Sequence, residues 1–262
     1  MNAITRILPL ALLLPACALL GDNDAVDEEV ATLSADGLSL LRVEQGRGGL
    51  SITGEADRDE IEVVVTVFGP PGTSAAEHVD LRLEADGDVA FLDCDTDLKG
   101  APRTIEVEIL APATLALQVH DGDGGMQITG FQAPVDVVDE AGDLSVGNHV
   151  GELFVRDGDG SLTLNSITGE VSVADEAGSL SISSIEGDVH VEDGDGALSV
   201  IGVVGDVDIE DGAGAIYVRD IAGAVRIWDG DGDIVVLEAD SAVVEEDGGG
   251  AVDLQEREPA EG

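Results

Sequence analysis

Residues 153–170 read LFVRDGDGSLTLNSITGE, and residues 171–188 read VSVADEAGSLSISSIEGD. Both stretches alternate apolar and polar residues, with an aspartate at the fifth position and a glycine at the eighth. Equivalent positions therefore recur every 18 residues. A glycine also falls on almost every ninth position from residue 124 to residue 250, with Ala133 and Ser241 as the exceptions. A short fixed period of this kind is typical of a solenoid, in which each repeat packs only against its neighbours.

Each 18-residue repeat divides into two similar halves, and each half predicts a short strand followed by a turn. The residues two and four positions after a glycine are apolar, as in Leu162 and Leu164 after Gly160. Alternation along a strand would point both of them inward. Glycine suits the turn, where a positive φ or a close approach to the next coil leaves no room for a Cβ atom. We therefore predict an all-β fold, a parallel β-solenoid (β-helix) with 18-residue coils of two strands.

The residues before the repeats predict a less regular sheet. Apolar residues alternate in several short stretches between residues 38 and 113, without a fixed period. We expect 38–113 to be an irregular N-terminal β segment that caps the solenoid repeats of 114–254, because an open end exposes core and strand edges. Residues 18–37 are acidic and are predicted to be a tether, and residues 255–262 a charged tail.

The first 17 residues resemble a bacterial export signal. Arg6 precedes an apolar stretch over 7–16 that is too short to span a bilayer. The stretch ends in Leu14-Pro-Ala-Cys17, which resembles the lipobox of bacterial lipoproteins. That resemblance implies that Cys17 becomes the lipidated N-terminus and, since Ala18 follows, that the protein reaches an outer membrane. The alternative is ordinary cleavage nearby. In both cases we expect an extracytoplasmic protein, at the outer membrane or cell surface.

The chain is strongly acidic. It has 56 Asp and Glu residues against 11 Lys and Arg residues, and a formal net charge of −45 at pH 7. This charge argues against nucleic acid as a partner, because phosphate binding needs clustered cations. Since 44% of the residues are hydrophobic, the chain is not a disordered acidic tail. The charge suits solubility, cation binding or a salt-rich habitat.

An aspartate with a strict period of 18 residues is the sharpest candidate site. In stacked coils these aspartates would form one column along a corner, and such a column attracts cations such as Ca²⁺, which prefers oxygen ligands. The plainer interpretation is that Asp-Gly is good turn chemistry and that solvent and salt relieve the repulsion. No other cofactor is predicted. The aspartates are Asp121, Asp139, Asp157, Asp175, Asp193, Asp211, Asp229 and Asp247.

An enzyme is not expected. The fixed period between residues 124 and 250 leaves no room for the long loops that would wall a catalytic groove, and no nucleophile motif is present. The four histidines lack metal-ligand spacing, and we expect single exposed side chains. His149 interrupts a column of apolar corner residues. Phe154, Tyr217 and Trp228 fall at outward positions and are candidate contact residues, although scattered exposed apolar residues are common on any surface.

The repeats also carry a family resemblance. The Gly-x-Val-x-Val repeats, the Asp-Gly turns and the lead-in Ile105-Glu-Val-Glu-Ile-Leu-Ala-Pro-Ala-Thr-Leu115 together resemble bacterial putative-adhesin repeat domains of unknown function. The resemblance covers roughly residues 38–254 and implies a β-helical domain of a secreted protein or lipoprotein. Its motifs are structural, so no functional residue is carried over from the family.

These observations predict a non-enzymatic cell-surface lipoprotein, an adhesin-like rigid β-solenoid for adhesion, envelope structure or interaction. Its expected partners are the membrane, through an N-terminal lipid anchor, and a surface glycan or protein ligand, but no nucleic acid. Two alternatives stay open. One is a Ca²⁺-dependent acidic surface module, and the other is a glycan-binding or glycan-active β-helix.

Overall fold

The computed structural model describes residues 25–70, 72–96 and 104–257, and most of them lie in β-strands. The chain divides into two units, Met1–Phe131 (unit 1) and Gln132–Gly262 (unit 2). The one helix in the described part is α1 (Ala75–His78), and no described helix is long and apolar enough to cross a membrane. The predicted signal segment, with Cys17, lies outside the described residues.

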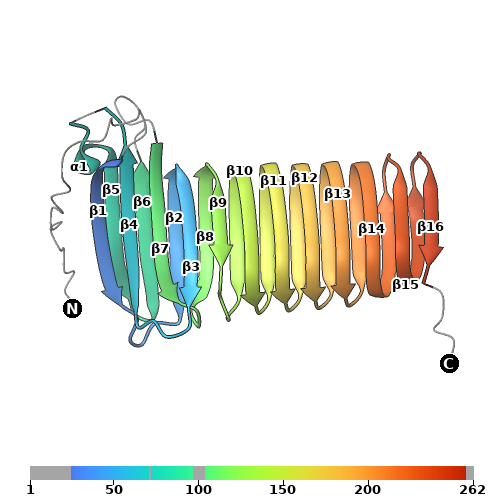
Figure 1. Cartoon of the computed structure of the whole chain (residues 1–262), viewed down its shortest axis with the longest axis horizontal. Coiled ribbons are helices and arrows are strands. Elements are labelled where there is room, and N and C mark those ends of the chain that lie inside the picture. The colour runs from blue at the N-terminus through green and yellow to red at the C-terminus, as the bar shows by residue number, and fades with distance from the viewer. Residues whose placement is uncertain (1–24, 71, 97–103, 258–262) are drawn as a thin grey trace, which may run out of the picture. The chain divides into compact units, whose positions relative to one another are not determined.

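Unit 2 is a parallel β-solenoid, as the sequence predicts. Each strand pairs in parallel with the next (Figure 1). Most residues lie opposite the residue 18 positions further along the chain, and the offset falls to 17 over a short stretch from Ala224 to Ile227. The strands of this unit are β10 (Val135–Val150), β11 (Leu153–Thr168), β12 (Val171–Glu186), β13 (Val189–Val204), β14 (Val207–Asp229), β15 (Ile234–Asp247) and β16 (Val252–Glu256).

A thin aliphatic core runs through unit 2. In β11 the side chains of Leu153, Val155, Leu162 and Leu164 are buried, whereas Phe154 between the first two is 44% exposed. The inward orientation predicted for the positions two and four past each glycine is therefore confirmed in this strand, whereas Val252 and Leu254 after Gly250 are exposed in the last coil. Equivalent residues of successive coils stack on one another, so burial of aliphatic side chains stabilises every interface between coils.

The two predicted strands of a coil join into one continuous strand that bends at the Asp-Gly corner. Pairing between β11 and β12 continues on both sides of this bend, from Leu153↔Val171 to Thr168↔Glu186. The pairing survives because both coils bend at the same residues. The second corner differs, since a residue with a left-handed φ, such as Ser166 at 59°, precedes the buried Ile167.

Glycine at the Asp-Gly corner has a steric cause. Gly160 has a φ of 152°, and a Cβ atom on it would overlap the carbonyl oxygen of Gly142 in the preceding coil. Gly178 would meet Gly160 in the same way. The glycines therefore allow neighbouring coils to approach to the strand spacing of about 4.8 Å.

The strands of unit 1 are not stacked in chain order. β2 lies between β6 and β8, and β3 lies between β7 and β9, with parallel pairing in all four cases. The β2–β3 coil is therefore inserted between coils that follow it in the sequence. The strands of this unit are β1 (Ala25–Ser34), β2 (Leu40–Arg47), β3 (Gly49–Glu55), β4 (Glu60–Phe68), β5 (Val79–Asp86), β6 (Val89–Thr96), β7 (Thr104–Pro112), β8 (Ala116–Asp123) and β9 (Met126–Thr129).

Antiparallel strands complete unit 1. β1 pairs with β4, β4 with β7, and β5 with β6. Part of the segment predicted to be an acidic tether is thus strand β1, and this part of the prediction is corrected. Leu33 of β1 is buried, and the carboxylate of Asp27 accepts a hydrogen bond from the backbone N–H of Ala75 (2.8 Å) at the start of α1. The acidic residues of this segment do not indicate a strand in the sequence. They are compatible with one because their charges lie at a sheet edge.

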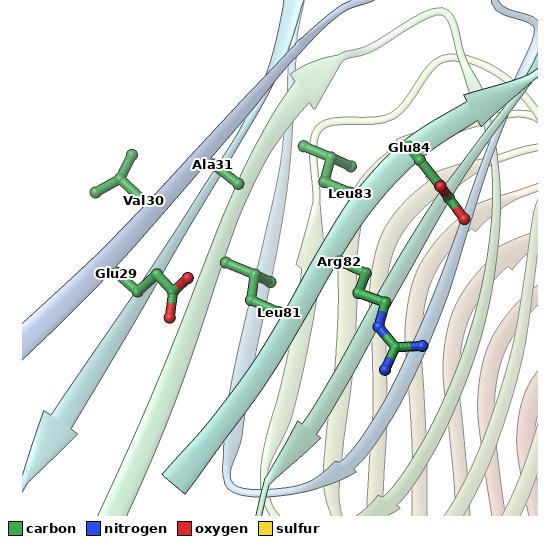
Figure 2. Close-up of a pocket in the computed structure, with 7 residues that line it drawn as sticks. All are labelled: Glu29, Val30, Ala31, Leu81, Arg82, Leu83 and Glu84. Atoms are coloured by element: carbon green, nitrogen blue, oxygen red, sulfur yellow. The ribbon is translucent and has the colours of Figure 1, made fainter. Parts of the chain in front are cut away.

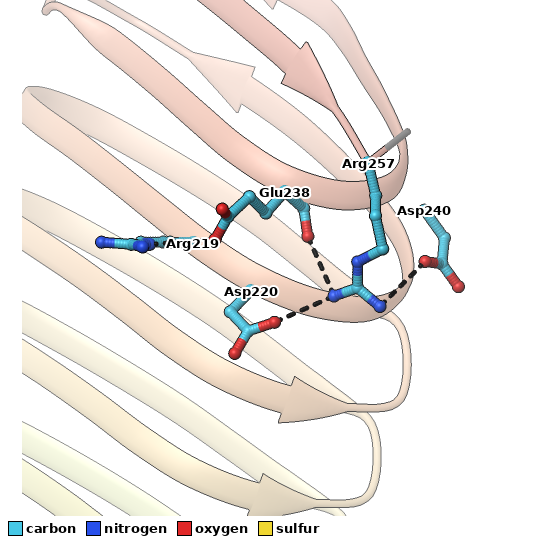
Figure 3. Close-up of polar contacts among 5 residues, drawn as sticks. All are labelled: Arg219, Asp220, Glu238, Asp240 and Arg257. Carbon is cyan, nitrogen blue, oxygen red and sulfur yellow. Dashed lines mark hydrogen bonds and ion pairs between the residues drawn. The ribbon is translucent and has the colours of Figure 1, made fainter. Parts of the chain in front are cut away.

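Arg257 fastens the end of the described chain to the two preceding coils (Figure 3). Its guanidinium donates hydrogen bonds to Asp220 Oδ1 (2.9 Å) and to the carbonyl oxygen of Glu238 (3.1 Å), and it forms an ion pair with Asp240 (3.4 Å). Its backbone N–H donates to the carbonyl oxygen of Ala239 (2.8 Å). The predicted charged tail therefore begins as ordered structure, because β16 continues to Glu256.

The steric role of the corner glycines predicts that Gly160→Ala destabilises the solenoid. We expect the free energy of unfolding, measured by urea denaturation, to fall by about 2–4 kcal/mol, because backbone must move to admit the Cβ atom. Gly46→Ala is the matched control, since a Cβ atom at Gly46 meets nothing within 4 Å. Equal effects of the two substitutions would contradict the steric explanation.

Candidate functional site

The predicted aspartates of unit 2 lie in register at the Asp-Gly corner and face the core. Asp157 pairs with Asp139 on one side and Asp175 on the other, and Asp193 pairs with Asp175 and Asp211. Their exposed fractions range from 2% for Asp157 to 7% for Asp211. The interpretation that solvent relieves their repulsion is therefore wrong. We call the six buried residues the Asp column: Asp139, Asp157, Asp175, Asp193, Asp211 and Asp229.

The two remaining predicted aspartates lie in other surroundings. Asp247 is exposed in β15, where it pairs with Asp229. Asp121 belongs to unit 1, where it is buried beside Gln45, and Gln45 pairs in turn with Cys94. The corner position of unit 1 is thus occupied by three different polar side chains. The sequence conceals this grouping because strand β2 is inserted out of chain order.

Five carboxylates of the Asp column are short of hydrogen-bond donors. Neither oxygen of Asp157, Asp175 or Asp193 has a partner in hydrogen-bonding geometry, and the carboxyl groups of Asp211 and Asp229 lie close enough to share a hydrogen bond. Backbone N–H groups of the corner, such as that of the residue after Asp157, lie near enough to lower the pKa slightly. Burial acts more strongly in the opposite direction, because it removes water from the charged form.

Burial and mutual repulsion raise the pKa values along the column. Burial, followed by the charge of Asp139, raises the pKa of Asp157 to about 6. Burial, followed by the charges of Asp157 and Asp193, raises the pKa of Asp175 to about 7. Burial, followed by Asp193 and then Asp229, raises the pKa of Asp211 to about 7. At neutral pH the column is therefore poised to take up protons or another cation.

The carboxylates of the Asp column form a line along the corner and do not surround a single point. Among the described residues, no three His, Cys, Asp or Glu side chains are placed together as ligands of one metal ion. Each gap between neighbouring coils from β10 to β14 instead presents two carboxylates of the Asp column, one from each coil. Such a gap can hold a proton shared between two carboxylates, or a cation that bridges them.

His149 and Cys94 are both buried. His149 occupies the corner slot that holds Ile167 in the next coil, and it is 2% exposed, so the expectation of an exposed histidine is wrong. Its Nε2 lies 3.3 Å from the carbonyl oxygen of Glu152. Burial, followed by nearby acidic groups, raises the pKa of the Cys94 thiol to about 12. A thiol with so high a pKa is a poor nucleophile at neutral pH.

The three predicted contact residues do not form one cluster. Phe154 lies on β11, while Tyr217 and Trp228 lie on different parts of β14. Tyr217 pairs with Ser199 and Val235, whereas Trp228 pairs with Glu246.

Tyr217 is the centre of a patch that the sequence prediction missed. Outward positions of β13, β14 and β15 bring Ile201, Tyr217, Arg219, Val235 and Leu237 into two adjacent columns. Ile201 is 40% exposed, and Arg219 donates a hydrogen bond to Glu238 Oε2 (3.2 Å). We call these five residues the Tyr217 patch. The 18-residue spacing from Ile201 to Arg219 and Leu237 is the signal that would have revealed it.

A small groove lies in unit 1 between strands β1 and β5 (Figure 2). Leu81 and Leu83 point toward β1, while Arg82 and Glu84 point the other way. The groove measures about 180 Å³. This is below the roughly 300–1,000 Å³ typical of small-molecule sites, so the groove is not a convincing ligand pocket.

Solved structures resemble this chain in fold. A putative adhesin from Bacteroides fragilis aligns with a TM-score of 0.51 and 13% identity, over 87% of this chain and 97% of that chain. A putative cell adhesion protein from Clostridium sporogenes gives a TM-score of 0.34 and 13% identity, over 82% and 99%. A putative lipid binding protein from Parabacteroides distasonis gives 0.38 and 12%, over 88% and 99%.

The similarity to the Bacteroides structure confirms the predicted resemblance to adhesin-like β-helical domains at the level of fold. At this identity it establishes the fold alone. The sequence matches no protein-family model and no curated protein.

The raised pKa values predict an unusual pH dependence when divalent cations are absent. In the unfolded chain Asp175 ionises near 3.8, but in the fold it ionises near 7. The folded state therefore binds more protons between these values, and stability is greatest in acid and falls as the pH rises through about 7. Thermal unfolding in chelator-treated buffers from about pH 4.5 to pH 8 measures this trend.

The Asp175→Asn variant distinguishes the effect of the Asp column on stability from the effect of the total charge of the protein. The Asn amide can donate to the neighbouring carboxylates, so we expect the variant to be more stable than the parent by about 1–3 kcal/mol at pH 8, with little gain at pH 4.5. Asp195→Asn makes the same charge change at an exposed corner residue. If both variants gain equally, total charge explains the effect and the column does not.

Proposed function

We propose that this chain is a non-enzymatic, adhesin-like surface module that presents flat sheet faces to a macromolecular partner. The observation that carries this proposal is the tight spacing of the coils. Only two residues separate β10 from β11, β11 from β12, β12 from β13, and β13 from β14. Turns this short cannot form the walls of a substrate groove, so the exposed faces of these coils suit a broad partner surface.

The Tyr217 patch is the best-supported contact surface. Tyrosine and arginine are enriched among the residues that contribute most to protein–protein binding, and aliphatic neighbours exclude water around them. The patch combines one of each with Ile201 and Leu237 on a chain whose surface is otherwise dominated by acidic residues. Because its neighbours are aliphatic and not further planar aromatics, it favours a protein partner over a glycan.

The location follows from the N-terminal sequence. We place the chain outside the cytoplasm, held at the outer membrane or cell surface by a lipid on Cys17, since Leu14-Pro-Ala-Cys17 resembles a lipobox. A lipid anchor would hold the sheet faces near the cell surface, where they can meet a partner.

Lipidation predicts that the full chain, expressed in a bacterium with lipoprotein export, incorporates a labelled fatty acid and sediments with membranes. Cys17→Ala should abolish both properties, because the thiol is the acceptor of the lipid. Cys94→Ala is the control and should abolish neither, since Cys94 is a buried thiol. Unlabelled protein, or label retained in Cys17→Ala, would show that the anchor is wrong.

The adhesive role is tested by displaying the full chain on a non-adherent laboratory bacterium and measuring retention under flow on collagen-coated and mucin-coated surfaces. We expect retention above that of cells without the chain on at least one surface.

The Tyr217→Ala, Arg219→Ala double variant should lower this retention by about tenfold, as loss of two hot-spot residues does. Thr163→Ala, an exposed residue in the same column as Tyr217 three coils earlier, is the control. Retention no better than that of bare cells would count against the proposal, and mucin retention unaffected by the double variant would favour a glycan elsewhere.

A further inference from the structure

The Asp column is a buried row of carboxylates. Five of its members, from Asp157 to Asp229, are at most 7% exposed, and Asp157, Asp175 and Asp193 have no partner in hydrogen-bonding geometry. Three arginines of unit 2 pair with other acids: Arg219 with Glu238, Arg226 with Asp208, and Arg257 with Asp220. Buried charges in proteins are normally paired or bound to a metal ion, so an unneutralised row of carboxylates requires a counterion.

We propose that the Asp column is a row of Ca²⁺ sites in which each ion bridges the carboxylates of two adjacent coils. The in-register pairing of Asp157, Asp175 and Asp193 fixes the geometry of these gaps. Equivalent atoms of paired parallel strands are about 4.8 Å apart. An ion midway between equivalent oxygens is therefore about 2.4 Å from each, within the 2.3–2.6 Å range of Ca²⁺–oxygen bonds.

The same spacing selects among cations. Mg²⁺ requires oxygen ligands at about 2.0–2.1 Å in a strict octahedron, which the strand spacing does not provide. Zn²⁺ favours nitrogen and sulfur ligands, and the column consists only of carboxylates. Ca²⁺ accepts irregular coordination, and backbone carbonyls and water can complete its shell beside two carboxylates.

Charge balance predicts how many gaps are filled. One divalent ion neutralises two aspartates, so a fully neutral column holds an ion in every second gap. The sequence alternates with the same period, since Asp159, Asp195 and Asp231 stand two residues beyond the column on alternate coils, with Ala177 and Ala213 between them. These three carboxylates are exposed at the same corner.

Protons compete for the same carboxylates. Burial disfavours the unpaired anions of Asp157, Asp175 and Asp211, so a proton or a cation stabilises the fold. Binding of Ca²⁺ must displace the protons that the column holds near neutral pH. The effect of Ca²⁺ is therefore expected to be larger at pH 8 than at pH 5.

The experiment is thermal unfolding of the purified full chain after removal of metals with a chelator. Melting temperatures are compared in millimolar CaCl₂, in MgCl₂, and in NaCl at the same ionic strength, at pH 8. We expect CaCl₂ to raise the melting temperature by about 5 °C or more beyond NaCl, with MgCl₂ close to NaCl. Calorimetric titration with CaCl₂ should show about one ion for every two aspartates of the column.

Two variants assign the effect to the Asp column. Asp175→Asn with Asp193→Asn removes two adjacent carboxylates and should reduce the Ca²⁺-specific rise by at least half. Asp159→Asn with Asp195→Asn removes two exposed carboxylates of the same corner and should leave most of the rise. Because the Asn amides can pair with neighbouring carboxylates, the buried variant is expected to fold, and its melting temperature in NaCl verifies this.

The alternative outcomes are distinct. Equal melting temperatures in CaCl₂ and NaCl would overturn the proposal and leave shared protons as the counterions of the column. A Ca²⁺ effect that the exposed variant removes, and the buried variant does not, would also overturn it, by placing the ions at the surface. Neither outcome depends on whether the Tyr217 patch binds a partner.

Discussion

The in-register stacking of 18-residue coils is the constraint on which the rest of unit 2 depends. Because each residue lies opposite its own equivalent in the next coil, a property at one position is repeated along a whole column. An aliphatic residue at an inward position therefore builds a continuous core, as the Leu162 column does. The same repetition makes glycine necessary at the corner, since a Cβ atom there meets the backbone of the neighbouring coil in coil after coil.

Repetition also concentrates charge. A single buried aspartate costs a domain little if one donor faces it, but stacking places Asp157 against Asp139 and Asp175, so its nearest side chains share its charge. The chain retains this arrangement at six buried positions, although Ile167 shows that an apolar residue fills the opposite corner well. A buried aspartate lowers the stability of the fold at each repeat, and an apolar residue could replace it. Its presence in successive coils is therefore better explained by a bound counterion than by turn geometry alone.

The sequence predicts most of the structure that repeats and much less of the structure that does not. The period predicts the coils, their inward residues and the alignment of the aspartates, because the same residue type recurs at equivalent positions of several repeats. It does not predict that Asp157 faces inward, because Asp-Gly is equally common at exposed turns. Nor does it predict the insertion of β2 and β3, the strand formed by residues 25–34, or the burial of His149, since each of these occurs once and depends on long-range pairing.

Residues that contact a partner are expected at positions where the 18-residue period does not restrict the residue type. Inward and corner positions are held to a few residue types by packing, but an outward position can change without disturbing the neighbouring coils. The outward columns accordingly vary, from Thr163 and Ser181 to Tyr217 in one column and from Asn165 to Ile201 and Arg219 in the next. The Tyr217 patch occurs where both columns change from small polar residues to large ones on adjacent coils. A rigid frame that fixes the spacing of such side chains reduces the entropy lost on binding, so a few outward substitutions are enough to give it a partner.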